Sequence, residues 1–426
     1  MIRSTPLVVA VLVGVASWST ANAFCTGDCD GNHSVAFNEL LDGVNISLGG
    51  AAVPSCENFD RNGDGRITVD ELVTATRSAL QGCVAQDQAF ILTSDFTTGS
   101  FATVDLDPPY AVMPSSPHHL LYQDAAVRSY GGALYVINRL FADNIQVLDP
   151  ARNFATRLQC SVGNSTNPHD IAFASSSKAY VTRFETAKLL IVNPSVQPNC
   201  ADFTLGTIDL SSLADADGNP DMDQMVVVDG LLYVSLERLN INSILRTPAK
   251  NGAIAVIDTA SDQLVGSIEL TGKNPFSSTN GLTVRDGFLY VSEVGLFGVL
   301  DGGIERVDLA TQRAEGFLVT EADLGGDIID FVLVSEHLAY AIVNQSNSKS
   351  ALLAFDPTTR EITATLLEAA GYTFGAIEMN DRGELYLADR AVRAPGIRIF
   401  RVADGTQLTA APLNLVLPPL EIVFIP

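Results

Sequence analysis

Residues 225–234 read "MVVVDGLLYV", and residues 282–291 read "LTVRDGFLYV", which is a near copy. In both, an Asp-Gly pair separates two apolar runs, and this pattern is typical of a β-hairpin with a tight turn. A hairpin that returns after about fifty residues indicates a fold built from repeated small sheets.

The second half of this hairpin occurs seven times along the chain. The copies are "FILT" at Phe90, "LYVI" at Tyr135, "AYVT" at Tyr180, "LYVS" at Tyr233 and Tyr290, "AYAI" at Tyr340 and "LYLA" at Tyr386. A further strand follows each copy, and in all but the last it ends at Asp or Asn: Asp105, Asp149, Asn193, Asp258, Asp308 and Asp356. Most copies also have an apolar strand before and an outer strand after. Four short strands per repeat predict a mainly β chain with a seven-bladed β-propeller over residues 85–426.

Two segments carry a family resemblance. "AIAVIDTASDQLVGSIELTG" (253–272) and "AYVTRFETAKLLIVNP" (179–194) resemble the YVTN/YncE-like seven-bladed propellers, and "FGAIEMNDRGELYLAD" (374–389) is similar to an NHL-type blade. Because such propellers bind varied ligands and some act only as scaffolds, the resemblance implies the fold and no particular chemistry.

The C-terminal segment "NLVLPPLEIVFIP" (414–426) accounts for a strand that the first repeat lacks. That repeat begins directly at "AFILTSDF", whereas "LEIVFI" near the C-terminus matches the innermost strands "HDIAFA" and "DQMVVV". We therefore expect the C-terminal strand to complete the first blade, which removes two exposed sheet edges. Pro418, Pro419 and Glu421 disfavour a membrane anchor.

The first 23 residues indicate export. Arg3 precedes the apolar run "PLVVAVLVGVASW" and an "ANA" cleavage signal, so residues 1–23 are predicted to be a signal peptide and the mature chain to begin at Phe24. We expect a secreted protein, whether extracellular, cell-surface-associated or periplasmic, without membrane insertion and monomeric. The net charge of -24 makes nucleic acid and anionic membranes poor partners and favours cations.

Two segments near the N-terminus have the pattern of a twelve-residue calcium loop. In "DRNGDGRITVDE" the expected ligands of Ca²⁺ are Asp60, Asn62, Asp64, the Arg66 carbonyl, Thr68 and the bidentate Glu71. In "DCDGNHSVAFNE" they are Asp28, Asp30, Asn32, the Ser34 carbonyl and Glu39. The earlier loop should bind more weakly, because His33 replaces the turn glycine and Ala36 offers no ligand.

Each loop is followed by residues with helical spacing, "AFNELLDGVNISLG" and "VDELVTATRSALQG", so residues 24–84 should form a paired loop-helix module. Val35 and Ile67 are the apolar residues expected to pair the two loops. The module resembles the dockerin type I and bacterial EF-hand repeats, which implies attachment to another component. Phe37, Asn38, Val69 and Asp70 stand where cellulosomal dockerins have Ser-Thr pairs, so a cohesin is not the expected partner.

Six cysteines in an exported chain predict three disulfides. Cys25, Cys29, Cys56 and Cys83 can pair in three ways, and the expected closeness of the module's ends favours Cys25 with Cys83 and Cys29 with Cys56. Cys160 and Cys200 lie one repeat apart and should join neighbouring blades.

The innermost strands place polar side chains at one mouth of the central channel. Counting back ten residues from the repeated tyrosines gives Asp170, Asp223, Asn280 and Asp330, and Glu421 heads the closing strand, with His169, Gln224 and Asp327 nearby. Converging carboxylates attract a cation or ordered water, although a wet, polar lining is also ordinary for a propeller channel.

Two functions are compatible with these features. The first is a secreted calcium-binding protein that binds a protein or carbohydrate ligand, or acts as a scaffold, and is attached through its small module. The alternative is a metal-dependent hydrolase, because Glu421, Asn280 and Asp330 resemble the metal ligands of SMP-30/gluconolactonase-type propellers, whose metal polarises a lactone carbonyl. The chain has no G-x-S-x-G elbow, and we prefer the binding role.

Overall fold

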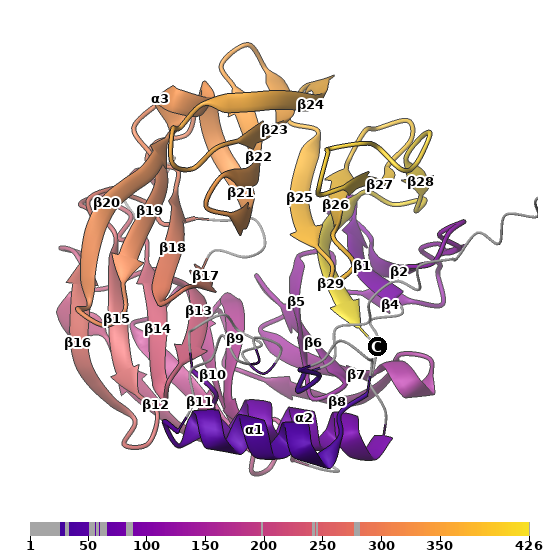
Figure 1. Ribbon diagram of the computed structural model, residues 1–426. Coiled ribbons are helices and arrows are strands. Elements are labelled where there is room, and N and C mark those ends of the chain that lie inside the picture. Colours follow the sequence, from indigo (N-terminus) through magenta and orange to yellow (C-terminus); the bar gives the residue numbers. More distant parts are fainter. Residues whose placement is uncertain are drawn as a thin grey trace, which may run out of the picture.

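The computed structural model describes residues 26–29, 34–50, 56, 59, 66–81, 88–196, 199–240, 243, 246–276 and 282–425. Seven antiparallel sheets are arranged in a ring around a central axis, as Figure 1 shows. The predicted seven-bladed β-propeller is confirmed, and the repeated tyrosine motif is the second strand of six blades.

The strands follow the chain from blade 1 to blade 7. Blade 1 consists of β29 (Pro419–Ile425), β1 (Gln88–Ser94), β2 (Gly99–Asp105), β3 (Val112–Met113) and β4 (Leu120–Leu121). Blade 2 consists of β5 (Ala125–Tyr130), β6 (Ala133–Asn138), β7 (Asn144–Asp149) and β8 (Ala155–Ser161). Blade 3 consists of β9 (Pro168–Ser175), β10 (Lys178–Arg183), β11 (Lys188–Val192) and β12 (Thr204–Asp209).

Blade 4 consists of β13 (Met222–Val228), β14 (Leu231–Leu236), β15 (Ala253–Asp258) and β16 (Gln263–Glu269). Blade 5 consists of β17 (Leu282–Arg285), β18 (Phe288–Glu293), β19 (Gly303–Asp308) and β20 (Arg313–Thr320). Blade 6 consists of β21 (Gly326–Ser335), β22 (Leu338–Gln345), β23 (Lys349–Phe355) and β24 (Ile362–Ala370). Blade 7 consists of β25 (Phe374–Met379), β26 (Glu384–Asp389), β27 (Gly396–Arg401) and β28 (Leu413–Asn414). Short helices are η3 (Pro150–Arg152), η4 (Ser211–Leu213) and α3 (Glu321–Leu324).

The C-terminal strand closes the ring as the sequence predicts. β29 pairs antiparallel with β1, with Phe90 opposite Val423 and Leu92 opposite Glu421. The ring of Phe424 meets Tyr386 of blade 7 edge-on, with centroids 5.1 Å apart. The last strand therefore completes blade 1 and packs against the blade before it, so the first and last segments of the propeller hold one another in place.

Buried apolar side chains fill the spaces between blades, and the repeated tyrosines explain part of this packing. Tyr180 is buried, and its hydroxyl donates to Asp262 of blade 4 at 2.6 Å. Tyr340 is buried as well, and its hydroxyl donates to the Val402 carbonyl of blade 7 at 2.6 Å. In these two blades a tyrosine supplies apolar area and also a hydrogen bond to the next blade, which aliphatic residues do not offer.

The ring has two distinct ends. We call the end at which the innermost strands begin the loop face; it carries the connections that follow the second and fourth strands, including 95–98, 139–143, 294–302, 371–373, 390–395 and 415–418. The opposite end carries the turns that follow the first and third strands, and we call it the turn face.

The N-terminal module contains α1 (Phe37–Ser47) and α2 (Val69–Gln81), close to the predicted helices. Its small core consists of Ile46, Cys56, Phe59, Ile67 and Ala75. The Phe59 ring lies so close to Gly43 on α1 that an added Cβ there would approach it to 2.3 Å, so the helix needs a glycine at this point.

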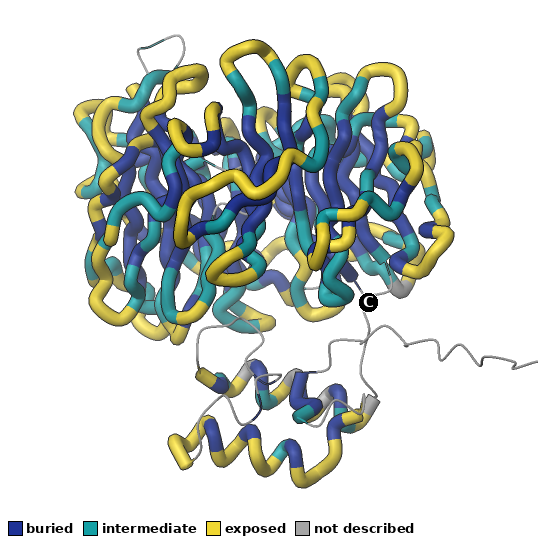
Figure 2. The backbone as a smooth tube through the Cα atoms, turned by 45° about the horizontal axis from the view of Figure 1, so that its top comes forward, coloured by how far each residue is buried: buried dark blue, intermediate teal, exposed yellow. Residues whose placement is uncertain are grey.

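Figure 2 shows the module beneath the ring, on the same side as the end of β29. That side is the turn face, and Arg66 of the module forms an ion pair there with Asp229, in the turn between β13 and β14. Within the described ranges, no helix is both long and apolar enough to span a membrane.

Candidate functional site

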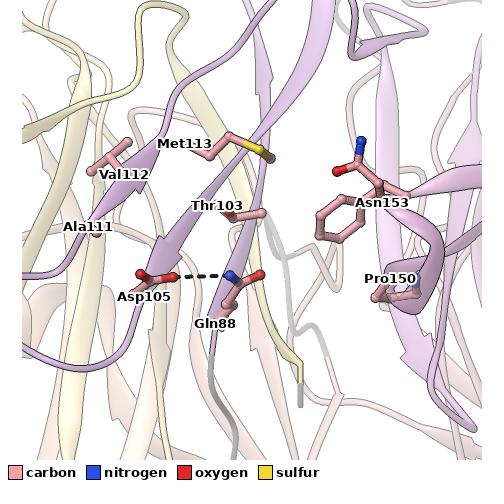
Figure 3. A pocket seen from close by; sticks show the side chains of 9 residues that line it. Gln88, Thr103, Asp105, Ala111, Val112, Met113, Pro150 and Asn153 are labelled. Atoms are coloured by element: carbon pink, nitrogen blue, oxygen red, sulfur yellow. Dashed lines mark hydrogen bonds between the residues drawn. The ribbon is translucent and has the colours of Figure 1, made fainter.

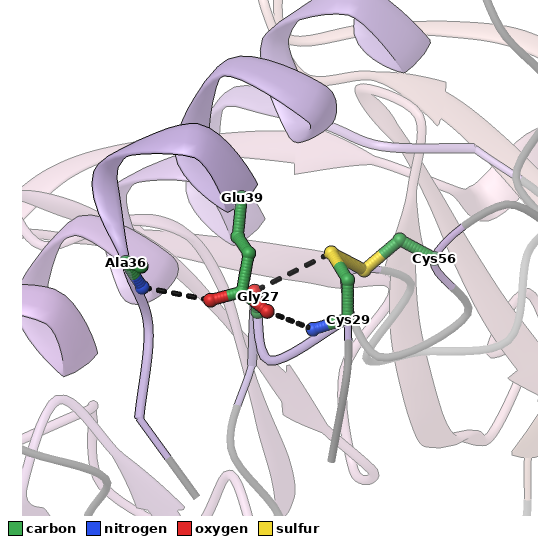
Figure 4. The surroundings of a disulfide bond; sticks show 5 residues. All are labelled: Gly27, Cys29, Ala36, Glu39 and Cys56. Carbon is green, nitrogen blue, oxygen red and sulfur yellow. Dashed lines mark hydrogen bonds between the residues drawn. A yellow bond between two sulfur atoms is a disulfide. The ribbon is translucent and has the colours of Figure 1, made fainter. Parts of the chain in front are cut away.

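Glu39, the expected twelfth residue of the first calcium loop, is buried at the start of α1 (Figure 4). One carboxylate oxygen accepts a hydrogen bond from the Ala36 N–H at 2.7 Å, and the other accepts from the Cys29 N–H at 2.7 Å. Asp28 is buried and Ser34 is exposed. The remaining expected ligands, Asp30 and Asn32, lie outside the described residues.

Glu71 has the corresponding place in the second loop. It is buried at the start of α2, and one oxygen accepts from the Thr68 N–H at 2.8 Å and from the Thr68 hydroxyl at 3.0 Å. Arg66 is exposed and Thr68 is half-buried. The other expected ligands, Asp60, Asn62 and Asp64, lie outside the described residues.

Both glutamates are buried in the first turn of their helices and accept backbone N–H groups there, Glu39 from Ala36 and Cys29 and Glu71 from Thr68. Val35 and Ile67, the residues expected to pair the loops, are buried as well. Buried carboxylates need a cation or several hydrogen bonds, and oxygen ligands suit calcium. Among the side chains that the structure describes, no group of three or more His, Cys, Asp or Glu is arranged to hold a metal.

The two module helices leave apolar side chains in water. On and just after α1 these are Phe37, Leu41, Val44 and Leu48; on α2 they are Val69, Val73 and Leu80. Spacings of three, four and seven residues place each set on one side of its helix. Phe37 is 75 % exposed, so this side of the module is not used for its own core.

Two of the predicted disulfides are present. Cys29 is bonded to Cys56 within the module (Figure 4), and Cys160 of blade 2 is bonded to Cys200 of blade 3. Cys25 and Cys83, the third predicted pair, lie outside the described residues. The two bonds observed agree with the favoured pairing in the module and with the expected link between neighbouring blades.

At the channel, Arg128 on β5 joins two of the predicted carboxylates. Its guanidinium contacts Asp170 of blade 3 at 2.8 Å, Glu421 of blade 1 at 2.5 Å and the Gln224 side-chain carbonyl of blade 4 at 2.8 Å. One side chain from blade 2 therefore links four blades. Burial would lower the pKa of Arg128, but Asp170 and Glu421 outweigh it and raise the pKa, so this arginine stays charged. The cation between these two carboxylates belongs to the chain itself.

Three of the predicted carboxylates also accept a backbone N–H from another blade. Asp170 accepts from Met225 at 2.7 Å, Asp330 from Ile377 at 2.9 Å, and Glu421 from Val127 at 2.6 Å. Burial raises the pKa of Asp170 to about 6, although Arg128 and two backbone N–H groups act in the opposite direction. The sequence located these residues at the starts of the innermost strands, and the structure adds that they connect neighbouring blades.

Asp223 lies in a different environment from the other three. His169 of blade 3 contacts its Oδ1 at 2.8 Å, and its side chain also forms a hydrogen bond with that of Glu237. Burial lowers the pKa of His169, which is therefore neutral near pH 7 and donates from Nδ1. Burial, followed by Asp223 and Asp221, raises the pKa of Glu237 well above its ordinary range. Burial also raises the pKa of Asp221 to about 7.

A separate pocket of about 500 Å³ lies near the turn face between blades 1 and 2 (Figure 3). Its lining residues are Gln88, Thr103, Asp105, Ala111, Val112, Met113, Pro150, Asn153 and Phe154. Gln88 donates to Asp105 at 3.0 Å. Phe154 packs against Phe101, with ring centroids 4.8 Å apart, so it serves the contact between the two blades.

Sequence reasoning found four of the channel residues but missed Arg128 and Glu237. Arg128 interrupts an otherwise apolar innermost strand, "AAVRSY", and a lone basic residue at such a position signals a buried partner. Glu237 follows the second strand of its blade rather than starting the first, so counting along innermost strands does not reach it. Asn280 lies outside the described residues.

No protein-family model matches the sequence, and no curated protein matches it either. Solved structures with a similar fold include the dihydro-heme d1 dehydrogenase NirN, with 14 % identity over 79 % of this chain and 75 % of that chain and a TM-score of 0.52. Apo AztD from Citrobacter koseri has 14 % identity over 79 % of this chain and 97 % of its own, with a TM-score of 0.50. The Dos1 propeller has 11 % identity over 78 % of this chain and 82 % of its own, with a TM-score of 0.50. Proteins this distant and this varied establish the propeller fold alone.

Proposed function

We propose that the chain is an exported, calcium-binding β-propeller that binds a protein or carbohydrate ligand and is attached to another component through residues 24–84. The observation that carries this proposal is the pair of exposed apolar rows on α1 and α2, in a module with two buried carboxylates where calcium loops need them. Exposed rows on both helices of one small unit are characteristic of a docking surface.

Calcium would couple folding of the module to attachment. Asp28, Glu39 and Glu71 are buried in a unit whose core has few residues, and the desolvation of buried carboxylates opposes folding. Ca²⁺ held by these residues, together with the expected ligands Asp60, Asp64, Asp30, Asn32 and Asn62, would offset that cost. The ion would thereby fix α1 and α2 with their apolar rows side by side.

The alternative, a metal-dependent hydrolase at the channel mouth, has less support. Of its three candidate ligands, Glu421 is engaged by Arg128 and by the Val127 N–H, and Asp330 accepts N–H groups from Phe331 and Ile377. A metal there would have to displace bonds that hold the blades together. We therefore retain the binding role.

The attachment is tested by affinity capture from the secreted fraction of the native host, with full-length protein as bait. The double variant Leu41→Ser/Leu48→Ser should lose the captured component, and chelation of calcium should have the same effect. Leu205→Ser is the matched control, since Leu205 is 53 % exposed but lies on the outer strand β12. Capture that survives both the double variant and chelation would contradict attachment through the module.

A further inference from the structure

The exposed apolar side chains of the propeller are concentrated on the loop face. They are Phe96, Leu120, Leu140, Phe141, Leu296, Phe297, Val299, Leu300, Tyr372, Val392 and Val416. The other large apolar side chains exposed on the described part of the ring, Leu205, Val265 and Ile362, lie on outer strands. The described turns of the turn face expose none of this size. One end of the ring therefore presents apolar groups and the other does not.

Three of these residues have a backbone conformation that their side chains disfavour. The φ angles of Phe96, Phe141 and Val416 are 62°, 72° and 74°, in the left-handed region where bulky and β-branched residues are rare. Phe141 is 83 % exposed, so burial of its side chain contributes little free energy that could offset this strain. Strain of this kind persists mainly where function requires a particular side chain to be presented.

The loops that carry the apolar groups are held by specific hydrogen bonds. In the loop 294–302, Asp301 accepts from the Leu296 N–H at 2.9 Å and Asp327 accepts from the Gly298 N–H at 2.8 Å. In the loop 139–143, the Leu140 carbonyl accepts from the Tyr122 hydroxyl at 2.6 Å. Because these hydrogen bonds already order the loops, the loops would lose little conformational entropy when a partner binds.

The channel mouth at the centre of the loop face is acidic. Asp223 at the start of β13 and Glu237 just after β14 are both buried there, and their side chains form a hydrogen bond with one another. The nearby basic group Arg246 is engaged by Glu185 at 2.9 Å. On the adjacent side of the channel, two other buried carboxylates, Asp170 and Glu421, are satisfied by the guanidinium of Arg128. Glu237 has a pKa raised well above its ordinary range and hydrogen-bonds with Asp223, so these two carboxyl groups together carry one negative charge, with which a cation from a partner can pair.

We propose that the loop face binds a protein partner whose contact surface is apolar and carries a lysine or arginine that pairs with Asp223 and Glu237. Apolar groups of the partner cover the loop tips, and its basic side chain enters the channel mouth as Arg128 does from within the chain. This inference rests on the binding role proposed above and names the ligand class as protein. A lipid surface is disfavoured by the net charge of -24 and by the acidic centre of this face.

The test uses full-length protein and random twelve-residue peptides displayed on phage, followed by affinity measurements with the selected peptides. Selected peptides should combine aromatic or aliphatic residues with at least one lysine or arginine. Phe141→Asn/Phe297→Asn should weaken binding by at least about tenfold, since two aromatic anchors are lost. Asp223→Asn/Glu237→Gln should weaken binding by about tenfold or more, because the basic group loses the negative charge that the two carboxyl groups share. Leu205→Asn is the control and should change the affinity less than twofold.

A second measurement separates a binding role from a structural one. Asparagine tolerates the left-handed region, so Phe141→Asn should leave the Tm unchanged or raise it while binding is lost. A lower Tm would assign Phe141 to the stability of the blade and overturn the argument from strain. Selected peptides without basic residues, full binding to the loop variants, or no selected peptides would each overturn the proposal.

Lipid vesicles and calcium removal give two further controls. Binding to vesicles of zwitterionic lipid that depends on Phe141 and Phe297 would identify the loop face as a membrane surface and overturn the protein-partner proposal. Peptide binding should be the same in Glu71→Gln and after chelation of calcium, because the module lies at the turn face. Failure of the calcium proposal and failure of this one can therefore be told apart.

Discussion

Arg128→Met should strongly destabilise the propeller, because it leaves two buried carboxylates without their cation. Asp170 and Glu421 are both buried, and Arg128 is the cation that both of them contact. Breaking a buried ion pair by removing one partner costs about 3–5 kcal/mol. Each carboxylate keeps at least one backbone N–H donor, Met225 for Asp170 and Val127 for Glu421, which places the expected cost within this range rather than above it.

The cost should depend on pH in a direction that follows from the same geometry. Without Arg128 a buried carboxyl group takes up a proton. Protonating a group whose ordinary pKa is near 4 costs about 1.4 kcal/mol for each unit by which the pH exceeds that pKa, so the cost at pH 7 is about 4 kcal/mol. At pH 5 the same step costs about 1–1.5 kcal/mol. A carboxyl group whose folded-state pKa is raised contributes most below its unfolded-state pKa and loses that contribution as the pH rises. The penalty of Arg128→Met should therefore shrink on acidification.

The assay is urea unfolding of full-length protein at pH 7 and pH 5, with two comparison variants. Arg401→Met removes an exposed ion pair with Asp404 and should cost less than about 1 kcal/mol at either pH. Arg128→Met combined with Asp170→Asn and Glu421→Gln should recover part of the lost stability, because the two carboxylates that Arg128 neutralised are then uncharged. An Arg128→Met protein within about 1 kcal/mol of the wild type at pH 7, or one with an equally large penalty at pH 5, would contradict the role of this buried ion pair.

Deleting residues 421–426 should lower solubility and the cooperativity of unfolding, because β1 and the adjoining face of blade 7 lose their partner; a melting curve like that of the intact chain would contradict ring closure by β29. Asp330→Asn should lower the free energy of unfolding by about 1–3 kcal/mol. The two carboxylate oxygens of Asp330 accept from the Phe331 and Ile377 N–H groups, whereas an amide has only one oxygen that can accept. An unchanged urea midpoint would argue against the inter-blade bond. Burial raises the pKa of Glu321 to about 8, so the stability that Glu321 contributes below about pH 4 should decline as the pH rises through 8. Burial, together with Glu305, also raises the pKa of Glu293, which changes stability in the same direction. Glu321→Gln should flatten that decline in melting temperatures measured from pH 5 to 9, and an equally steep curve would contradict the assignment.

Much of the fold could be predicted from local pattern because each blade is a local structure. The strands of six blades are neighbours in sequence, and the Asp-Gly turn and repeated tyrosine mark the first two of them in blades 4 and 5. Closure by β29 was also predictable, because a missing first strand in one repeat left a matching strand at the other end of the chain.

The environment of the channel residues could not be predicted in the same way. Counting along strands located Asp170, Asp330 and Glu421, but their role depends on which atoms of other blades they meet across the ring. Arg128 contacts residues 42, 96 and 293 positions away, and no local pattern encodes such separations. The apolar loop face was missed for a related reason. Its members are distributed over separate segments of the chain, and only the closed ring brings those segments to one end.

The measurement that tests the proposed function most directly is the number of calcium ions bound per full-length chain, determined by titration calorimetry after exhaustive chelation. We predict two ions for the wild type, because each predicted loop ends in a glutamate and both glutamates, Glu39 and Glu71, are buried. Glu71→Gln should abolish the tighter event and Glu39→Gln the weaker one, since each substitution removes the bidentate carboxylate of its site. Glu336→Gln, an exposed change in the propeller, should leave both events intact. A wild-type protein that shows no calcium-dependent heat, or a stoichiometry that neither glutamate variant alters, would contradict the account.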